Sequence, residues 1–327
     1  MVKIYAVNSG SQPFKDGFSF EYLKSKGVEY TGNPFTADIL LAATPDVKRA
    51  KIFRWLFPFK KMAYWTNEPR FNTTTDHFDT SRSCTMNVYS GNVFLHNLHF
   101  LGSYHYDFEN DLGIDLASPP GAPLTMESLA AKTKFCAALY VYKEPESSRL
   151  FIDGKDISLN GARQNLAAFL YEQNKADIFG SGWPEEIKVQ EESGFDAGGK
   201  TWWVRKMEVL QDYRFNICFE NTAYPNYCTE KLWHAIAAGS LPIYTSFNSS
   251  VYDTFPKDSF VDASEFGSHQ ALLTFLENLS PEEHILRYNR CLTVMHNACK
   301  SRLTDPVMKT DVIDAFVEKI SAFAKKN

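Results

Sequence analysis

One stretch of the sequence, residues 213–245, constrains the fold more than any other. Its apolar run from Phe215 to Phe219 is short and nearly continuous, as expected of a strand buried on both faces. Polar residues follow, and a helix is predicted to begin near Thr229, whose hydroxyl can cap the first turn. Gly239 marks the end of that helix, and Leu241–Tyr244 resumes an extended run. The segment therefore predicts a β-α-β unit.

The first turn of this helix carries an unusual lysine. Ligands of β-α-β units bind where the strand ends and the helix begins, because free N–H groups there favour anions. Glu230 and Lys231 fall at this point. A cation at the amino end of a helix opposes the helix dipole, so Lys231 is better explained if a phosphate completes the site. The alternative is that Lys231 is a solvated surface residue, and the spacing alone does not choose between the two.

Beyond these local patterns, residues 213–266 resemble the signature of glycosyltransferase family 10, the α1,3/α1,4-fucosyltransferases. The matching groups keep the family's order and are Phe215 to Asn221, Asn226 to Lys231, Ala238 to Ile243 and Tyr252 to Phe266. Thr222 and Asn226 stand where the family has serine and aspartate, and the rest of the chain matches more loosely. The resemblance implies that GDP-fucose is held by Glu220, Asn221, Tyr227, Thr229, Glu230 and Lys231, with the lysine touching the diphosphate.

Positive charge must stabilise the diphosphate that leaves when a sugar is transferred. Many glycosyltransferases recruit a metal ion with an Asp-x-Asp motif, and this sequence contains none. We therefore expect no metal, and assign the charge to Lys231 and Arg163. The family has an arginine at the place of Arg163 that grips the diphosphate, and the planar fork of arginine suits this task. The alternative is an arginine on the surface of a helix.

A base must take the proton of the acceptor hydroxyl. The segment Ala63 to Pro69 resembles the family segment whose last glutamate is the proposed base, and Glu68 is the matching carboxylate. Two departures matter: the small residue between Glu and Pro is missing, and Trp65 is one residue closer to Glu68. The alternative is a solvated loop glutamate. Glu220 has an alternative of its own, since a glutamate at a strand end can brace the following loop.

The chain also divides into two series of strands and helices. Candidate strands are Ile4–Val7, Ile39–Ala42, Met62–Trp65, Phe135 to Val141 and Asp177–Phe179, and candidate helices are Phe20 to Lys26, Gly161–Asn174 and Asp311 to Ala324. The proline-rich residues 118–124 form the best linker. We predict an α/β protein of the GT-B class, with two facing Rossmann-like domains and a cleft between them. Residues 1–124 would bind the acceptor, 125–303 would bind the GDP-sugar, and 304–327 would form a helix that packs back on the first domain.

Composition narrows the partners and the location. The net charge of −5 and the lack of a long basic run argue against nucleic acid. No signal peptide or spanning segment is visible, so we expect a cytoplasmic protein, with peripheral association at the inner membrane as an alternative. None of the six cysteines forms a Cys-x-x-Cys pair, and we expect free thiols rather than a zinc site.

The expected function is inverting transfer of fucose from GDP-fucose to a hydroxyl of a glycan, in an α1,3-type linkage. One alternative is a GDP-dependent transferase of another deoxyhexose. Another is a catalytically inactive, carbohydrate-binding homologue on the same fold. The joint presence of Glu68, Arg163, Glu230 and Lys231 favours the enzyme.

Overall fold

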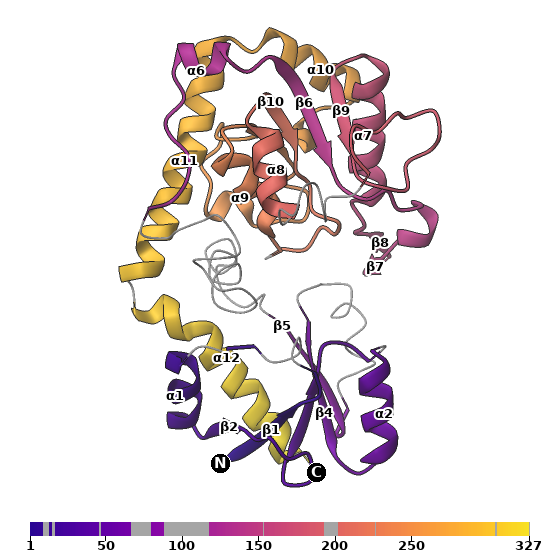
Figure 1. The fold of residues 1–327 in the computed structure, drawn as a ribbon, viewed down its shortest axis with the longest axis vertical. Helices are drawn as coiled ribbons and strands as arrows, with labels where there is room; N and C mark the ends of the chain where they lie inside the picture. Colours follow the sequence, from indigo (N-terminus) through magenta and orange to yellow (C-terminus); the bar gives the residue numbers. More distant parts are fainter. Residues whose placement is uncertain are drawn as a thin grey trace. The chain divides into compact units, whose positions relative to one another are not determined.

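A computed structural model of the chain describes residues 1–8, 13–14, 17–45, 47–66, 80–87, 118–152, 154–192, 202–225, 227–304 and 306–326. The chain divides into two compact units (Figure 1). Unit 1 comprises Met1–Asp107 and Thr304–Asn327, and unit 2 comprises Phe108–Leu303. Each contains a parallel sheet with helices, so both are Rossmann-like, and the α/β architecture expected from the sequence is confirmed. Within the described residues, no helix is both long and apolar enough to cross a membrane.

Unit 1 is built on a sheet whose described strands have the order β2-β1-β3-β4-β5, all parallel. The bounds are β1 (Val2–Ala6), β2 (Val28–Tyr30), β3 (Ile39–Ala42), β4 (Lys61–Thr66) and β5 (Ser83–Asn87), with helices α1 (Gly17–Ser25), α2 (Lys48–Leu56) and α12 (Pro306–Lys325). All four residues of β3 are buried, which explains why this strand reads as a continuous apolar run. Leu40, Met62 and Tyr64 form a core with Ala50 of α2.

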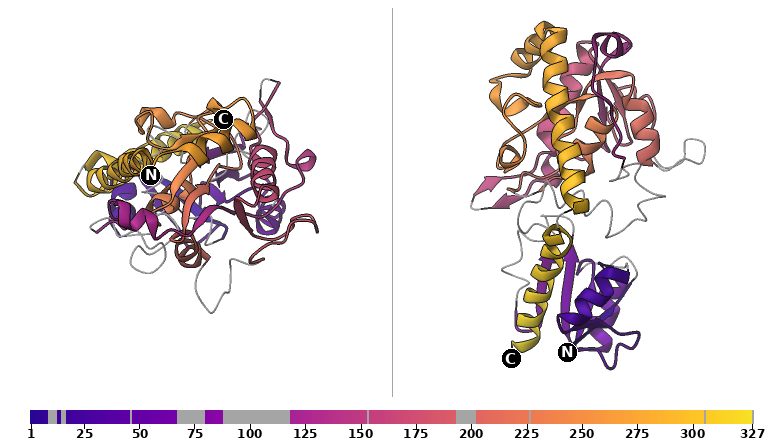
Figure 2. Two further views of the ribbon diagram at one scale, coloured as in Figure 1. Left: turned by 90° about the horizontal axis from the view of Figure 1, so that it is seen from above. Right: turned by 90° about the vertical axis from the view of Figure 1, so that its left-hand side faces the viewer.

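Helix α12 belongs to unit 1 although it lies at the other end of the chain. Figure 2 shows it running beside the strands of this unit. Its Asp314 accepts a hydrogen bond from the hydroxyl of Tyr22 on α1 at 3.0 Å and pairs with Lys26 at 3.0 Å. Its Phe316 ring packs edge-on against Trp65 of β4, with 5.4 Å between centroids. The amphipathic pattern predicted over 311–324 therefore corresponds to a helix with one face buried in unit 1.

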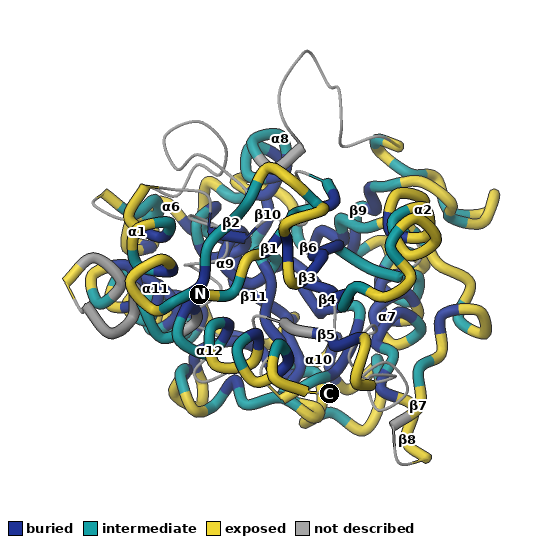
Figure 3. The backbone as a smooth tube through the Cα atoms, turned by 90° about the horizontal axis from the view of Figure 1, so that it is seen from below, coloured by how far each residue is buried: buried dark blue, intermediate teal, exposed yellow. Residues whose placement is uncertain are grey.

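Unit 2 contains a second parallel sheet, with the order β12-β11-β10-β6-β9 among the described strands. Its strands are β6 (Lys134–Leu139), β9 (Ala176–Phe179), β10 (Tyr213–Ile217), β11 (Leu241–Tyr244) and β12 (Val261–Asp262), beside a hairpin of β7 (Phe151–Ile152) and β8 (Lys155–Asp156). Its helices are α6 (Met126–Ala130), α7 (Asn160–Glu172), α8 (Trp202–Leu210), α9 (Glu230–Ala237), α10 (His269–Asn278) and α11 (Pro281–Thr304). Figure 3 shows that β10 and β11 are largely buried.

The proline-rich stretch packs on unit 2. Gly121 has a φ of 94°, and a Cβ added there would lie 2.8 Å from the side chain of Leu292 on α11. Leu124 N–H donates to the Asn289 side chain at 2.8 Å, and Asn289 returns a bond to the carbonyl of Leu124 at 3.3 Å. The six cysteines are free and buried.

Candidate functional site

The predicted β-α-β unit is present in unit 2. Strand β10 pairs in parallel with β11, with Phe215 opposite Leu241, and α9 connects them. The apolar face of α9 is completely buried, and Gly239 follows the helix with a φ of 79°, which favours glycine. Residues 218–229 therefore lie at the carboxyl end of β10 and the amino end of α9, where this architecture binds its ligands.

Glu220 braces this loop from inside. Its side chain is only 2% exposed. One carboxylate oxygen accepts from the backbone N–H of Thr229 at 2.6 Å, and the other accepts from the Thr229 hydroxyl at 2.6 Å. Burial raises the pKa of Glu220, while the charge of Lys231 opposes that effect. These contacts match the alternative in which Glu220 supports the loop that carries the ligand-binding residues.

Thr229 is the residue that precedes α9, but its hydroxyl does not form the expected cap. It donates to Glu220 and accepts from Lys231 Nζ at 2.7 Å. The prediction of a side-chain cap was wrong because the hydroxyl oxygen accepts from the ammonium of Lys231, a charged donor, in place of a backbone N–H of the helix. Lys231 Nζ also lies 3.3 Å from Glu220 and 3.5 Å from Glu230, and its side chain is 20% exposed. The lysine is therefore fixed in place and is not a freely solvated surface residue.

Arg163 reaches the same loop from α7. Residues 157–159 pair with 221–223 in an antiparallel bridge between Ser158 and Thr222, and Leu159 N–H donates to the Asn221 carbonyl at 2.9 Å. This pairing holds the start of α7 against the end of β10. Arg163 is 5% exposed, and its guanidinium lies 4.5 Å above the ring of Tyr140. Its nitrogens donate to Asn160 at 2.6 Å and to the Phe219 carbonyl at 3.5 Å. It is not an arginine on an exposed helix surface.

The two predicted cations therefore converge on one place. Arg163 contacts Phe219, and Lys231 contacts Glu220, the next residue in the chain. Tyr227 lies in the same loop and is 2% exposed, and Asn221 contributes the carbonyl that anchors Leu159. Glu68, the expected base, lies outside the described residues. The structure thus brings Arg163 and Lys231 to the loop of unit 2 that contains the other residues predicted from the sequence to hold the donor.

Sequence reasoning missed a third cation, Lys206 on α8. It is 7% exposed, and burial lowers its pKa, with the charge of Glu230 acting in the opposite direction. Burial also works to raise the pKa of Glu230, but the charges of Lys231 and Lys206 outweigh it and lower that pKa to about 2. Glu230 is therefore ionised at neutral pH. A signal was available, because Lys206 lies three and four residues from Trp203, Trp202, Val209 and Leu210, in the middle of the apolar face of α8.

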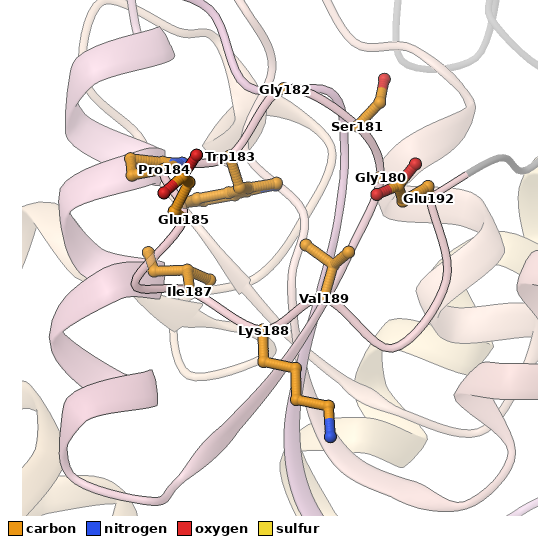
Figure 4. A pocket seen from close by; sticks show the side chains of 10 residues that line it. All are labelled: Gly180, Ser181, Gly182, Trp183, Pro184, Glu185, Ile187, Lys188, Val189 and Glu192. Atoms are coloured by element: carbon orange, nitrogen blue, oxygen red, sulfur yellow. The ribbon is translucent and has the colours of Figure 1, made fainter.

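One cavity of unit 2 is lined in part by Phe219, whose carbonyl accepts from Arg163, and a second is lined by residues that follow β9. One, of about 390 Å³, is lined by Leu159, Ala162, Phe219, Phe247, Phe266 and their neighbours. The other, also of about 390 Å³, is formed by residues 180–192 after β9 (Figure 4). Gly180, with a φ of 105°, allows the chain to pass Tyr140, whose carbonyl would lie 2.4 Å from an added Cβ. Trp183 donates to the same carbonyl at 3.3 Å. Tyr140 thus supports both Arg163 and the wall of this cavity.

The part of the chain that matches a known protein family contains this site. The family model for the carboxyl-terminal part of glycosyltransferase family 10 (fucosyltransferase) matches residues 155–297. Residues 155–297 belong to glycosyltransferase family 10. The family 10 domain contains Arg163, Lys206, Glu220, Glu230 and Lys231.

Curated relatives match over a shorter segment. An α-(1,4)-fucosyltransferase of Arabidopsis thaliana is 40% identical over 74 residues, which are 23% of this chain and 18% of that protein. A human 4-galactosyl-N-acetylglucosaminide 3-α-L-fucosyltransferase is 37% identical over 78 residues, 23% of this chain and 22% of that protein. The match thus spans about a fifth of the length of these relatives.

Solved structures resemble the whole chain at low sequence identity. The DNA-modifying enzyme β-glucosyltransferase is 10% identical, with a TM-score of 0.51 over 98% of this chain and 99% of that chain. The similarity shows a shared fold. An α1,3-fucosyltransferase solved with GDP-fucose is 17% identical, with a TM-score of 0.45 over 91% of this chain and 90% of that chain.

The family 10 domain contains two buried histidines, and we expect them to make its folding stability sensitive to acid. Burial lowers the pKa of His234 and of His284 from 6.5 to about 3 each. Below pH 6.5 the unfolded chain takes up protons that these folded imidazoles do not, so stability is intact above pH 6.5 and falls as the pH drops towards 3. Each histidine should lower the free energy of unfolding by about 2 kcal/mol between pH 7.5 and pH 5.

The measurement is urea unfolding of the wild type and His284→Phe at pH 7.5 and pH 5. His284 is 0% exposed and packs 5.0 Å from the ring of Phe215, so phenylalanine suits the position. The difference at pH 7.5 gives the packing effect of the substitution. The variant should lose about 2 kcal/mol less than the wild type on acidification. Equal losses would show that His284 does not titrate as its burial implies.

Proposed function

We propose that this protein transfers fucose from GDP-fucose to a hydroxyl of a glycan, with inversion at the sugar and without a metal ion. Support comes from the family 10 domain and above all from one observation. Two cations from different helices, Arg163 and Lys231, contact consecutive residues at the carboxyl end of β10. Such a pair suits a diphosphate, which carries charge on both phosphoryl groups.

In this proposal different residues of unit 2 bind the diphosphate and the hydroxyl groups of the donor. Arg163 and Lys231 stabilise the departing GDP, and their contacts with Tyr140, Asn160 and Glu220 hold them in place before the substrate arrives. Glu230 remains ionised and accepts hydrogen bonds from hydroxyl groups of the nucleotide sugar. A cavity of about 390 Å³ is lined by Phe219, whose carbonyl accepts from Arg163, and it is within the usual size range of small-molecule sites and offers room for the nucleoside.

Acceptor activation is assigned to Glu68. The hydroxyl of the acceptor attacks the anomeric carbon of fucose as the bond to the diphosphate breaks, and Glu68 takes the hydroxyl proton. Attack opposite to the leaving group gives inversion. The family relatives are named for transfer to galactosyl-N-acetylglucosaminide acceptors, so a lactosamine is the first acceptor to test. The linkage we propose is of the α1,3 type.

The decisive experiment is incubation of the full chain with GDP-fucose and N-acetyllactosamine, scored by mass spectrometry. We expect a product heavier than the acceptor by one deoxyhexose, whose anomeric configuration by NMR is opposite to that of the donor. Parallel reactions with UDP-glucose and with other GDP-sugars test donor choice. Transfer from UDP-glucose but from no GDP-sugar would refute the proposal. A reaction in EDTA tests the role of metal: loss of turnover that manganese restores would contradict the metal-free mechanism.

A further inference from the structure

Unit 1 exposes a set of large apolar side chains that its own core does not use. Phe35, Trp55 and Phe59 are 76%, 79% and 85% exposed, and Ile52 and Leu56 are 43% and 51% exposed. These five residues are called the α2 patch, because Ile52, Trp55 and Leu56 lie on α2 and Phe59 follows it. Single exposed apolar residues are common on proteins, but a contiguous group of this kind marks an interaction site.

Helix α2 has two apolar stripes, and only one of them serves the fold. Ala50 is buried in the core of unit 1, and Phe53 packs on it with its ring 5.6 Å from that of Tyr5. Ile52, Trp55 and Leu56 have the spacing i, i+3, i+4 and therefore share a second face. This face is exposed, as the yellow segments of α2 in Figure 3 indicate.

The α2 patch is held in shape by the fold. The Phe35 ring packs edge-on against Phe57, with 5.2 Å between centroids. Lys60 Nζ donates to the Phe35 carbonyl at 2.9 Å, and Lys60 N–H donates to the Phe57 carbonyl at 3.1 Å. These contacts fix the loop of Phe35 and the turn of Phe59 next to each other. The patch is a formed surface that needs little ordering on binding.

The charged residues of α2 and of the turn that follows it are all basic. Residues 47–61 contain six basic residues and no acidic residue, in a chain whose net charge is −5. Lys48, Arg49, Lys51 and Arg54 are exposed on α2. An exposed apolar face edged by cations matches an anionic bilayer surface, where aromatic rings enter the interface and each nearby cation gains from the lipid charge.

We infer that the α2 patch docks this protein onto the surface of an anionic lipid bilayer. Other occupants fit less well. Two copies meeting through this patch would bring their cations together, which is unfavourable. Nucleic acid would match the charge, and its bases could stack on the aromatic rings. It would offer the aliphatic side chains of Ile52 and Leu56 no apolar surface to contact. The docking residues are separate from Arg163, Lys231 and Glu68, so membrane binding does not rest on the proposed transfer reaction.

The test is flotation of the full chain with vesicles of phosphatidylcholine, with and without phosphatidylglycerol. We expect binding only to the anionic vesicles, weakened by salt, and a blue shift of tryptophan fluorescence on binding. Trp55→Ser with Phe59→Ser should weaken binding at least about tenfold. The matched control is Phe18→Ser with Phe151→Ser, which removes two aromatic residues that are 53% and 56% exposed elsewhere. This control should bind like the wild type.

A second series tests the charges. Lys48→Gln, Arg49→Gln and Lys51→Gln together should weaken binding at least about tenfold, whereas the equal charge change in Lys24→Gln, Lys155→Gln and Lys257→Gln should not. All variants change exposed residues, and thermal unfolding checks that they fold. Failure of the wild type to bind anionic vesicles would overturn the proposal. A dimer that Trp55→Ser with Phe59→Ser dissociates, or binding to duplex DNA without binding to vesicles, would overturn it in favour of another partner.

Discussion

Replacing Arg163 or Lys231 with alanine is expected to lower kcat/KM for GDP-fucose by about ten- to a hundredfold each. A charge-assisted contact to a phosphate contributes on the order of 1.5–3 kcal/mol, which corresponds to that range. The measurement is transfer to a fixed acceptor at subsaturating GDP-fucose, with calorimetry of GDP binding to each variant. Unchanged kinetics and unchanged GDP affinity in both variants would remove the diphosphate assignment.

The main confounding effect is that both cations also hold the loop. Lys231 pairs with the buried Glu220 at 3.3 Å, so its loss leaves that carboxylate without its cation. Glu220→Gln is the matched control, because it breaks the same ion pair but keeps the lysine. If Lys231 acts only through Glu220, the two variants should lose similar activity and their combination should lose no more. If Lys231 binds the diphosphate, Lys231→Ala should lose far more GDP affinity than Glu220→Gln.

A second substitution of Arg163 separates the effect of its charge from that of its shape. Arg163→Lys keeps the positive charge but loses the planar fork and its stacking on Tyr140, which lies 4.5 Å below the guanidinium. We expect Arg163→Lys to recover only part of the GDP affinity lost in Arg163→Ala. Full recovery would mean that only charge is required at this position. Thermal unfolding of both variants separates a loss of binding from a loss of folding.

Local patterns were enough to predict the strands and the helix that carry the candidate site. Strand β10, helix α9 and strand β11 follow from two apolar runs and from Gly239, because a buried parallel strand and a helix end have distinct residue requirements. The strands β2 and β5 were not predicted, since Val28–Tyr30 is short and Ser83–Asn87 is largely polar. Pairing with a neighbouring strand stabilises such segments, and that information is not local.

Some of the site residues could also be predicted from the sequence, whereas the contacts of others could not. Arg163 and Lys231 were chosen from residue type and resemblance, and the structure places both at one loop. Thr229 and Glu220 are nine residues apart in the sequence, and the loop between them brings their side chains together. The sequence alone could therefore not show that the two side chains form a hydrogen bond. Lys206 was missed because a lysine on a helix is usually solvated, although its place among apolar neighbours was visible.

Replacing Glu68 with glutamine is expected to abolish most turnover while leaving GDP binding intact. General-base catalysis typically contributes about a hundred- to ten-thousandfold, and glutamine keeps the size of the side chain but cannot accept the proton. Glu68 belongs to unit 1, whereas the proposed donor residues belong to unit 2, so donor affinity should change little. The measurement is kcat at saturating acceptor, together with calorimetry of GDP binding.

Two further variants test whether the loss of turnover in Glu68→Gln comes from the loss of a catalytic base. Glu68→Asp keeps a carboxylate on a shorter side chain, so it should retain more activity than Glu68→Gln if proton removal is the role. Asp79→Asn is the alternative carboxylate to test, since it follows in the same part of the chain. Transfer by Glu68→Gln at nearly the wild-type rate would make Glu68 a loop residue, and a large loss in Asp79→Asn would then move the base there. A loss of GDP binding in Glu68→Gln would instead show that unit 1 takes part in holding the donor.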